Sequence, residues 1–299
     1  MKNFLSPSEL SKYFIDLGIA KANNTFFKLL LLGILAGVYI GFAAHLATTV
    51  GTGWEFDGTP ILFGVKKLFV GAVFSLGLML VMIPGSELFT GNVLMTMSLC
   101  NRDISLFKML RNWGIVYLGN LIGAVLLAFM IASLSGLNDG SVGATAINLA
   151  YDKVTIGGAN HNLMFFIRGI ACNWLVCLAI IMATASQDIT GKILSCFFPI
   201  MAFVASGFEH SIANMYFIPA GIFSKGFEKA VTLSGKTSDL LVNLNWTSFI
   251  NDNLIAVTLG NIIGGGLFVG VVYWVIYIKD SKKDLEKEFE QEKNLVKTV

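Results

Sequence analysis

Two short polar runs interrupt apolar stretches of the sequence, and they carry the residues most able to do chemistry. Glu87 is separated by four residues from Asn92, Glu209 is separated by four residues from Asn214, and His210 directly follows the second acid. A carboxylate or an imidazole is costly inside a membrane, so such residues usually mark the path of an ion or a proton. Two matching interruptions in two apolar segments predict a channel or transporter with an internal repeat.

Each interruption divides a membrane helix into two pieces, and the second piece begins near the bilayer midplane. A helix start exposes backbone N–H groups and the positive end of the helix dipole, which together favour an anion. We expect Glu87 and Glu209 to cap these N–H groups, and His210 to lie on the pathway rather than to be a structural core histidine. Thr90, at the first break, has two interpretations of equal weight. Its hydroxyl donates to an anion or to the imidazole, or it bonds its own helix backbone.

The composition is that of a membrane protein. Of the 299 residues, 55% are hydrophobic and 13% are charged, and the mean hydropathy is +0.72, whereas soluble domains carry about 25% charged residues. A net charge of +2 gives no reason to expect a nucleic acid partner. No cysteine spacing matches a zinc or redox motif and no histidines pair as haem or metal ligands, so we expect no cofactor, no metal and no enzyme activity. The cysteines and histidines of the chain are Cys100, Cys172, Cys177, Cys196, His45, His161 and His210.

Six segments are long and apolar enough to span a bilayer, which takes about 20 residues. Four are continuous and free of charged residues, namely 29–54, 112–138, 169–187 and 253–278. Two are broken, the second span into 68–86 and 88–101 and the fifth into 193–208 and 211–224. The sequence therefore predicts an all-α membrane protein with six transmembrane helices, of which helices 2 and 5 are discontinuous.

The segments outside the spans give the orientation. Residues 1–28 are an N-terminal amphipathic segment, residues 29–278 the pore domain, and residues 279–299 a charged tail. The N-terminal segment opens with a capping box at residues 6–9, and one apolar face of the helix that follows is expected to lie on the membrane surface, with a gating role as the less favoured alternative. Of the 21 Lys and Arg residues, fourteen lie in segments that are cytoplasmic if both termini are inside. This excess predicts cytoplasmic termini.

The two halves of the chain repeat each other. The run 119–123, Gly-Asn-Leu-Ile-Gly, matches the run 260–264, Gly-Asn-Ile-Ile-Gly, and Gly33-Ile34 matches Gly169-Ile170. Three spans per half is an odd number, so the halves enter the membrane with opposite orientations. The sequence therefore predicts an inverted 3+3 repeat.

The chain resembles the formate/nitrite transporter family along almost its whole length. The resemblance is carried by residues 87–92 (Glu-Leu-Phe-Thr-Gly-Asn), 205–215 (Ala-Ser-Gly-Phe-Glu-His-Ser-Ile-Ala-Asn-Met), 253–255 (Asn-Leu-Ile) and 260–266 (Gly-Asn-Ile-Ile-Gly-Gly-Gly). It implies an aquaporin-like fold with six helices per protomer, a homo-pentamer, and one pore through each protomer.

The resemblance also implies polar pathway residues, carried over position by position. His210 matches the central pore histidine, and Thr90 matches its partner on the broken second helix. Lys153 matches a vestibule lysine that gathers anions. Asn173 and Asn261 match pore-side asparagines, and hydrogen bonding between helices remains open for both.

Two apolar constrictions are implied in the same way. Leu78 and Phe203 match the outer constriction, and Leu88 and Phe89 lie near the cytoplasmic one. Packing in the core or against lipid remains open for Leu78, Phe203 and Phe89. Pro84, just before the second-span break, departs from the family pattern and should help to end the first half-helix.

Together these expectations describe a channel or transporter for small monovalent anions of weak acids, multi-pass in the inner membrane. A bare anion is costly to desolvate in an apolar constriction, whereas proton coupling at a mostly neutral His210 lets a neutral acid cross. The match around His210 and Asn261 looks most like the formate branch, so formate is the first expected substrate. Nitrite, hydrosulfide and, in an aquaporin-like channel, a neutral solute are the alternatives. The expected partners are the anion, protons, the lipid bilayer and further copies of the chain.

Overall fold

Six helical segments in the computed structural model are long and apolar enough to cross a membrane, counted over the residues that it describes, 4–56, 59–60 and 62–279. They are Phe26–Val50, Phe63–Gly85, Leu106–Leu134, His161–Ala185, Ile189–Ser206 and Trp246–Tyr277. The predicted number of spans is therefore confirmed. The expected charged tail lies outside the described residues, except for Lys279.

Most spans consist of more than one helix. Span one is α2 (Phe26–Val50), and span two is α3 (Phe63–Phe74), α4 (Leu76–Leu80) and a π-helical turn (Val81–Gly85), followed by α5 (Phe89–Asn92), a 3-10 turn (Val93–Met95) and α6 (Thr96–Cys100). Span three is α7 (Leu106–Phe129) with a π-helical turn (Met130–Leu134), span four is α9 (His161–Ala185), and span five is α10 (Ile189–Ser206) and α11 (Ser211–Ser224). Span six is α14 (Trp246–Phe249), α15 (Ile255–Asn261) and α16 (Val272–Tyr277), joined by π-helical Ile250–Leu254 and Ile262–Val271.

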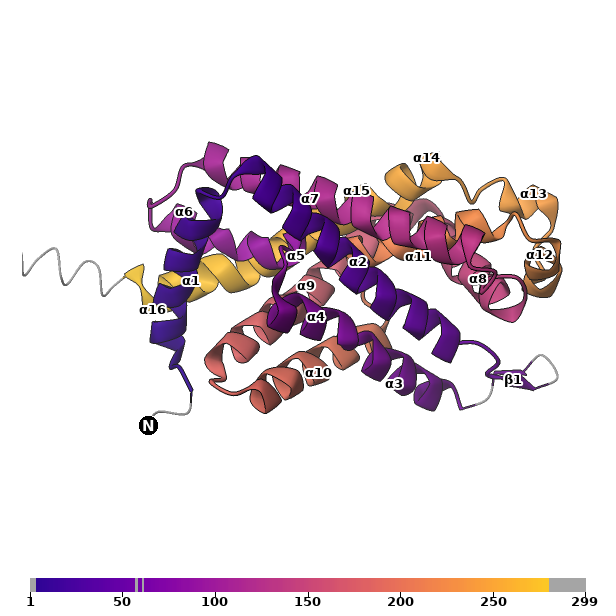
Figure 1. Ribbon diagram of the computed structural model, residues 1–299, viewed down its shortest axis with the longest axis horizontal. Helices are drawn as coiled ribbons and strands as arrows, with labels where there is room; N and C mark the ends of the chain where they lie inside the picture. The colour runs from indigo at the N-terminus through magenta and orange to yellow at the C-terminus, as the bar shows by residue number, and fades with distance from the viewer. Residues whose placement is uncertain (1–3, 57–58, 61, 280–299) are drawn as a thin grey trace, which may run out of the picture.

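The remaining elements lie outside the spans. They are α1 (Pro7–Ala22), α8 (Ser141–Thr155), a 3-10 turn (Gly158–Asn160), α12 (Glu228–Ser234), α13 (Ser238–Leu241) and the antiparallel pair β1 (Glu55–Phe56) and β2 (Thr59–Pro60). The sequence analysis did not predict this short strand pair. Figure 1 shows α1, α6 and α16 at one end of the molecule and α8, α12 and α13 at the other, with the spans running between the two ends.

Three spans begin at residues that satisfy the free N–H groups of a helix start. The side chains of Thr25, Ser105 and Asp188 accept hydrogen bonds from the third residue of α2, α7 and α10. Inside the bilayer no water replaces a missing backbone partner, so the chain must form helices there and must find special partners wherever a helix is broken.

Both predicted breaks are present. In span two, Pro84 lies in the last helical turn, Gly85 has a φ of +90°, and Ser86 is extended with φ −160° and ψ 176°. Pro84 therefore lies in the turn that ends the first half-helix, as expected. In span five the chain leaves α10 through Gly207, whose φ of +78° suits glycine, and reaches α11 through His210, which is extended with φ −110° and ψ 116°.

The predicted repeat is visible in the packing of the helices. A Cβ atom on Gly123 would collide with the carbonyl oxygen of Ile34, and one on Gly264 would collide with the carbonyl oxygen of Ile170. Spans one and three therefore touch backbone to backbone, and spans four and six do so at the equivalent place. Small residues allow this close approach between membrane helices.

The expectation that the N-terminal helix lies on the membrane surface is wrong. The capping box of Ser6 and Glu9 is present, but the apolar face of α1, including Phe14, is buried against α6 and the turn before it. The Ser98 hydroxyl donates to the carbonyl of Ile15 at 2.8 Å. The apolar face of α1 packs against α6 instead of against the bilayer, because Gly18 has no side chain and leaves room for Ser98.

Candidate functional site

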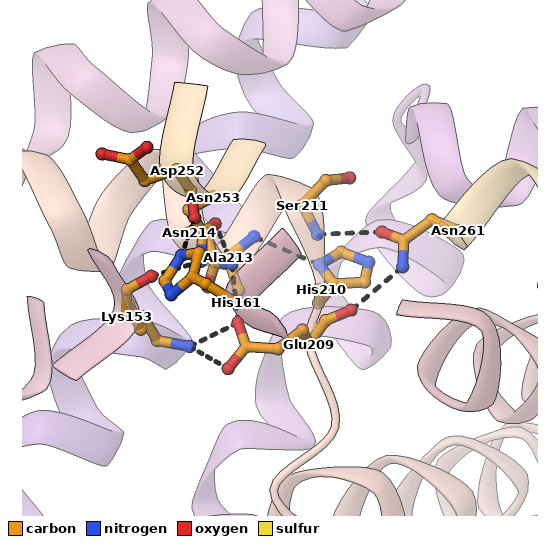
Figure 2. Close-up of polar contacts among 10 residues, drawn as sticks. All are labelled: Lys153, His161, Glu209, His210, Ser211, Ala213, Asn214, Asp252, Asn253 and Asn261. Carbon is orange, nitrogen blue, oxygen red and sulfur yellow. Dashed lines mark hydrogen bonds and ion pairs between the residues drawn. The ribbon is translucent and has the colours of Figure 1, made fainter. Parts of the chain in front are cut away.

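The breaks of spans two and five meet at Thr90 and His210. Nε2 of His210 lies 2.8 Å from Oγ1 of Thr90, and both residues are buried. Nδ1 of His210 accepts the backbone N–H of Ala213 at 3.1 Å, which caps the start of α11 (Figure 2). These partners assign the neutral tautomer with its proton on Nε2. Of the two interpretations of Thr90, the geometry therefore favours bonding to the imidazole.

Asparagines from spans three and six hold the two broken ends. Oδ1 of Asn120 accepts the N–H of Phe89 at 2.9 Å, and Oδ1 of Asn261 accepts the N–H of Ser211 at 2.9 Å. Their amide groups donate back across each break. Asn120 donates to the carbonyls of Gly33 and Glu87 at 2.8 and 2.9 Å, and Asn261 donates to those of Gly169 and Glu209 at the same two distances. An amide suits this place because it supplies a donor and an acceptor without a charge.

The expectation that Glu87 and Glu209 cap the half-helices is therefore wrong. Glu87 accepts from Lys21 at 2.7 Å and from Asn92 at 2.6 Å. Glu209 accepts from Lys153 at 2.7 and 2.9 Å and from Asn214 at 2.7 Å. Each buried carboxylate is thus neutralised by a lysine. A charge that leaves water needs such a partner, which no backbone N–H group provides.

The equal spacing between Glu and Asn in the two runs reflects this arrangement. Asn92 donates to Asn112, and Asn214 donates to Asn253, as Figure 2 shows for the second pair. Asn112 then donates to the carbonyl of Lys21, and Asn253 donates to that of Lys153. Each half therefore links a glutamate, two asparagines and a lysine into one polar network.

Lys21 is a site residue that the sequence analysis missed. It comes from α1, and its counterpart Lys153 comes from α8, so the inverted repeat includes these two helices in addition to the spans. The signal was present in the sequence. Lys153 precedes span four, the first span of the second half, so the repeat predicts an equivalent lysine shortly before span one.

Three cavities follow one another past the two breaks. A cavity of about 240 Å³ on the α8 side, named the outer cavity here, reaches His210 and includes Lys153 and Phe203 in its wall. A cavity of about 110 Å³ on the α1 side, named the inner cavity, includes Lys21 and Leu88. Between them is a space of about 10 Å³, lined by His210 and by apolar side chains only: Ile40, Phe74, Leu78, Leu88, Val176, Ile200 and Phe203. This volume is at the lower limit for a single water molecule.

The structure separates the predicted constriction residues. Leu78, Phe203 and Leu88 line the central space. Phe89 does not line any of the three cavities described above. Its ring packs edge-on against Trp113 at 6.0 Å and Tyr117 at 4.9 Å. The packing interpretation therefore holds for Phe89. Its backbone N–H is bound to Asn120 of span three, and its ring packs on Trp113 and Tyr117 of the same span.

Asn173 and Asn261 also follow the helix-bonding interpretation. Asn173 donates to the carbonyls of Thr90 and Asn261 at 3.1 and 2.7 Å, which ties span four to the broken second span and to span six. Neither asparagine is in the wall of these cavities, and both are fully buried. They position the breaks and do not face the path.

The outer cavity contains a second acid, Asp152, on α8 beside Lys153. Partial burial raises the pKa of the Asp152 carboxyl, and the charges of Lys236 and Lys153 act in the opposite direction. Because the net shift is upward, this carboxyl gains its proton at a higher pH than an ordinary aspartate. The outer cavity therefore becomes more positive as the pH falls.

The described residues contain no group of three or more His, Cys, Asp or Glu side chains that could hold a metal ion. The four cysteines are free thiols.

Comparison with known proteins gives a consistent result. The family model described as "Formate/nitrite transporter" matches residues 8–275. A "Probable formate transporter" from Methanothermobacter thermautotrophicus is 42% identical over 291 residues, covering 93% of this chain and 99% of that protein. "Formate channel FocA" from Escherichia coli (strain K12) is 38% identical over 287 residues, covering 93% of this chain and 96% of that protein. A solved structure described as "Pentameric formate channel with formate bound" superimposes with a TM-score of 0.73 at 40% identity, covering 85% of this chain and 98% of that one.

Proposed function

The chain belongs to the formate/nitrite transporter family, and we propose that it is a channel for small monovalent anions of weak acids, with formate as the main substrate. The observation that carries the proposal is the small central space, whose one polar lining residue, His210, is hydrogen-bonded to Thr90. The three similar proteins named above are all described as formate transporters or channels. The activity is passage across the membrane, without covalent chemistry.

The central space sets the energetic problem. It has room for about one water molecule, so an anion crosses it without its hydration shell, at a large cost in free energy. A small carboxylic acid has a pKa of about 4, so a proton is accessible when the anion leaves water. The neutral acid then passes Leu78, Phe203 and Leu88 far more easily than the anion.

The Thr90 and His210 pair stabilises the substrate while it changes charge. The Nε2–H group of His210 donates to Oγ1 of Thr90, which leaves the Thr90 hydroxyl proton free to donate to the substrate. Because Nδ1 is occupied by the N–H of Ala213, the imidazole does not take up a second proton without losing the cap on α11. We therefore propose that the proton reaches the anion from water in a cavity, and that His210 and Thr90 polarise the anion as it accepts that proton.

The remaining predicted residues have supporting roles in this proposal. Lys153 and Glu209 form a paired charge in the outer cavity wall close to His210. Asn173 and Asn261 fix the positions of Thr90 and of the start of α11. Residues 29–278 form the pore domain, with the amphipathic segment 1–28 on the cytoplasmic side and the charged tail 279–299 in the cytoplasm.

We propose that the protein is a homo-pentamer in the inner membrane with both termini cytoplasmic. The similar solved structure is described as pentameric, which supports this assembly. Many large apolar side chains are exposed on the spans, among them Phe42, Leu126 and Leu194, and these would contact lipid or neighbouring protomers.

A competition flux assay tests the proposed function. Purified protein in liposomes is supplied with formate, nitrite, hydrosulfide, acetate, lactate or glycerol, and passage is followed for each. We expect formate to pass fastest and glycerol to be excluded. Passage of glycerol without formate would show a neutral-solute channel instead, and passage of nothing would rule out the proposal.

A further inference from the structure

The outer cavity has more positive than negative side chains in its wall. The cations are Lys67, Lys153 and Arg168, and the acids are Asp152 and Glu209. Lys153 was expected to gather anions, but both of its close contacts with a carboxylate are to Glu209, at 2.7 and 2.9 Å. A lysine held by a buried carboxylate has its charge compensated locally. Once Lys153 and Glu209 cancel, the wall keeps two cations, Lys67 and Arg168, and one acid, Asp152, so the net positive charge of the cavity comes from Lys67 and Arg168.

Lys67 and Arg168 have aromatic partners instead of acidic ones. Nζ of Lys67 lies 5.7 Å from the centre of the Phe63 ring, and the guanidinium of Arg168 lies 5.7 Å from that of Phe165. No carboxylate among the described residues lies within ion-pair distance of either cation. Both side chains are half-buried, and Lys67 lies within electrostatic range of Arg168. An apolar wall strengthens the attraction of such cations for an anion, because little solvent screens them.

The chemistry of Arg168 adds a preference for one class of anion. A guanidinium presents a planar fork of N–H donors that matches two oxygen atoms on one carbon or nitrogen, whereas an ammonium acts as a point charge. Formate and nitrite have this two-oxygen shape, and hydrosulfide does not.

The inner cavity has no equivalent of this pair. Among the described residues that line it, Lys21 is the only charged one, and Lys21 is bound to Glu87. The two halves of the chain share the paired lysines but not the additional cations. Any effect of Lys67 and Arg168 should therefore act on anions that enter from the outer side.

We infer that Lys67 and Arg168 form a recruiting site in the outer cavity for small anions with two oxygen atoms, a step that rests on the proposed function and places recruitment upstream of His210. The site concentrates the anion before it is desolvated. It changes the concentration at which flux saturates and leaves the central barrier unchanged.

The test is formate uptake into right-side-out membrane vesicles, measured against external formate at low ionic strength. R168Q and K67Q should each raise KM about three- to tenfold and leave the maximal rate within about twofold. The effect should shrink at about 0.5 M salt, where charges are screened. K66Q, which removes the same charge one residue away and outside the cavity wall, should change KM much less. D152N removes a negative charge from the wall and should lower KM.

The two-oxygen preference has its own variant. R168K keeps the charge but not the fork, so it should raise KM for formate and leave that for hydrosulfide unchanged. In inside-out vesicles, which present the inner cavity to the medium, the R168Q and K67Q effects should largely disappear.

Each outcome bears on a separate statement. Wild-type vesicles without formate uptake would contradict the proposed function itself. Uptake with an unchanged KM in both R168Q and K67Q would overturn the recruiting site, and so would equal effects of K66Q and K67Q. A wild-type KM for formate in R168K would overturn the two-oxygen preference. Oligomer size after extraction serves as the folding control, and if R168Q does not assemble, K67Q and its salt dependence decide the question.

Discussion

Nε2 of His210 lies 2.8 Å from Oγ1 of Thr90, so one side-chain contact joins the two halves of an inverted repeat. The surrounding frame is symmetric, since each half supplies a glutamate, an asparagine five residues later, and a lysine from a helix outside the spans. The pair inside the frame is not symmetric. In the repeat, His210 corresponds to Leu88 and Thr90 corresponds to Ile212. The Glu, Asn and Lys network therefore occurs in both halves, whereas the Thr90 and His210 pair occurs once.

Topology is tested by cysteine labelling. Asp103, between spans two and three, and Ser238, in α13, are exposed at opposite ends of the molecule. In a variant with Cys100 replaced by alanine, Ser238→Cys should react with a membrane-impermeant maleimide added to intact cells, and Asp103→Cys should react only after the cells are opened. The reverse result would invert the proposed orientation.

Phe203 and Phe89 should differ in what they control. Phe203 lines the central space, and its ring lies 6.0 Å from that of His210. Phe203→Ala should therefore raise flux and weaken discrimination against larger anions such as lactate. Phe89→Ala removes a ring packed on Trp113 and Tyr117, and should cost about 3–5 kcal/mol of stability without changing selectivity. Flux ratios of formate to lactate and thermal unfolding distinguish the two, and altered selectivity in Phe89→Ala alone would reverse the assignment.

The sequence was sufficient for some of these features and insufficient for others, for physical reasons. The breaks, the six spans and the repeat depend on local composition, such as the Glu-to-Asn spacing and the runs that contain Asn120 and Asn261. Which group caps which N–H depends on how closely spans three and six approach the breaks. Lys21 lies 66 residues before Glu87, so their pairing arises only when α1 folds under the spans. The family resemblance implies a place for Phe89 near a constriction, but residue type alone does not distinguish a ring that lines a pore from one that packs beside it.

Removing only one partner of the Lys21 and Glu87 ion pair should destabilise the protein more than removing both. Their side chains are 18% and 9% exposed, and their charged atoms lie 2.7 Å apart. Lys21→Met leaves an uncompensated buried carboxylate and should destabilise the protein by about 3–5 kcal/mol. The double variant Lys21→Met with Glu87→Gln should recover much of this loss, whereas Lys12→Met, on the exposed face of α1, should have almost no effect. Thermal unfolding of the extracted oligomer provides the measurement, and a double variant less stable than Lys21→Met would contradict the ion-pair interpretation.

The dependence of flux on pH should reside in the Thr90 and His210 pair. His210→Asn is the informative change, because asparagine is a good helix N-cap and can replace Nδ1 in accepting the N–H of Ala213. The variant should therefore assemble, but it lacks the Nε2–H group that, together with Thr90, polarises the anion while it accepts a proton from cavity water. We expect the wild type to pass more formic acid and less free formate as the pH falls from about 8 to about 5, because the anion gains a proton more readily as the pH approaches the pKa of about 4 of a small carboxylic acid. The variant should conduct formate without this profile.

Variants of Thr90 separate polarisation from packing. Thr90→Val keeps the shape of the side chain and removes the hydroxyl that donates to the substrate, and a hydrogen bond to a charged group contributes about 1.5–3 kcal/mol. Formate flux should therefore fall about tenfold or more, because 1.4 kcal/mol corresponds to a factor of ten. Thr90→Ser restores the hydroxyl and should restore most of the flux. If His210→Asn keeps the wild-type pH profile and Thr90→Val conducts as well as Thr90→Ser, the two residues only hold the breaks together, and the anion must be protonated without help from this pair.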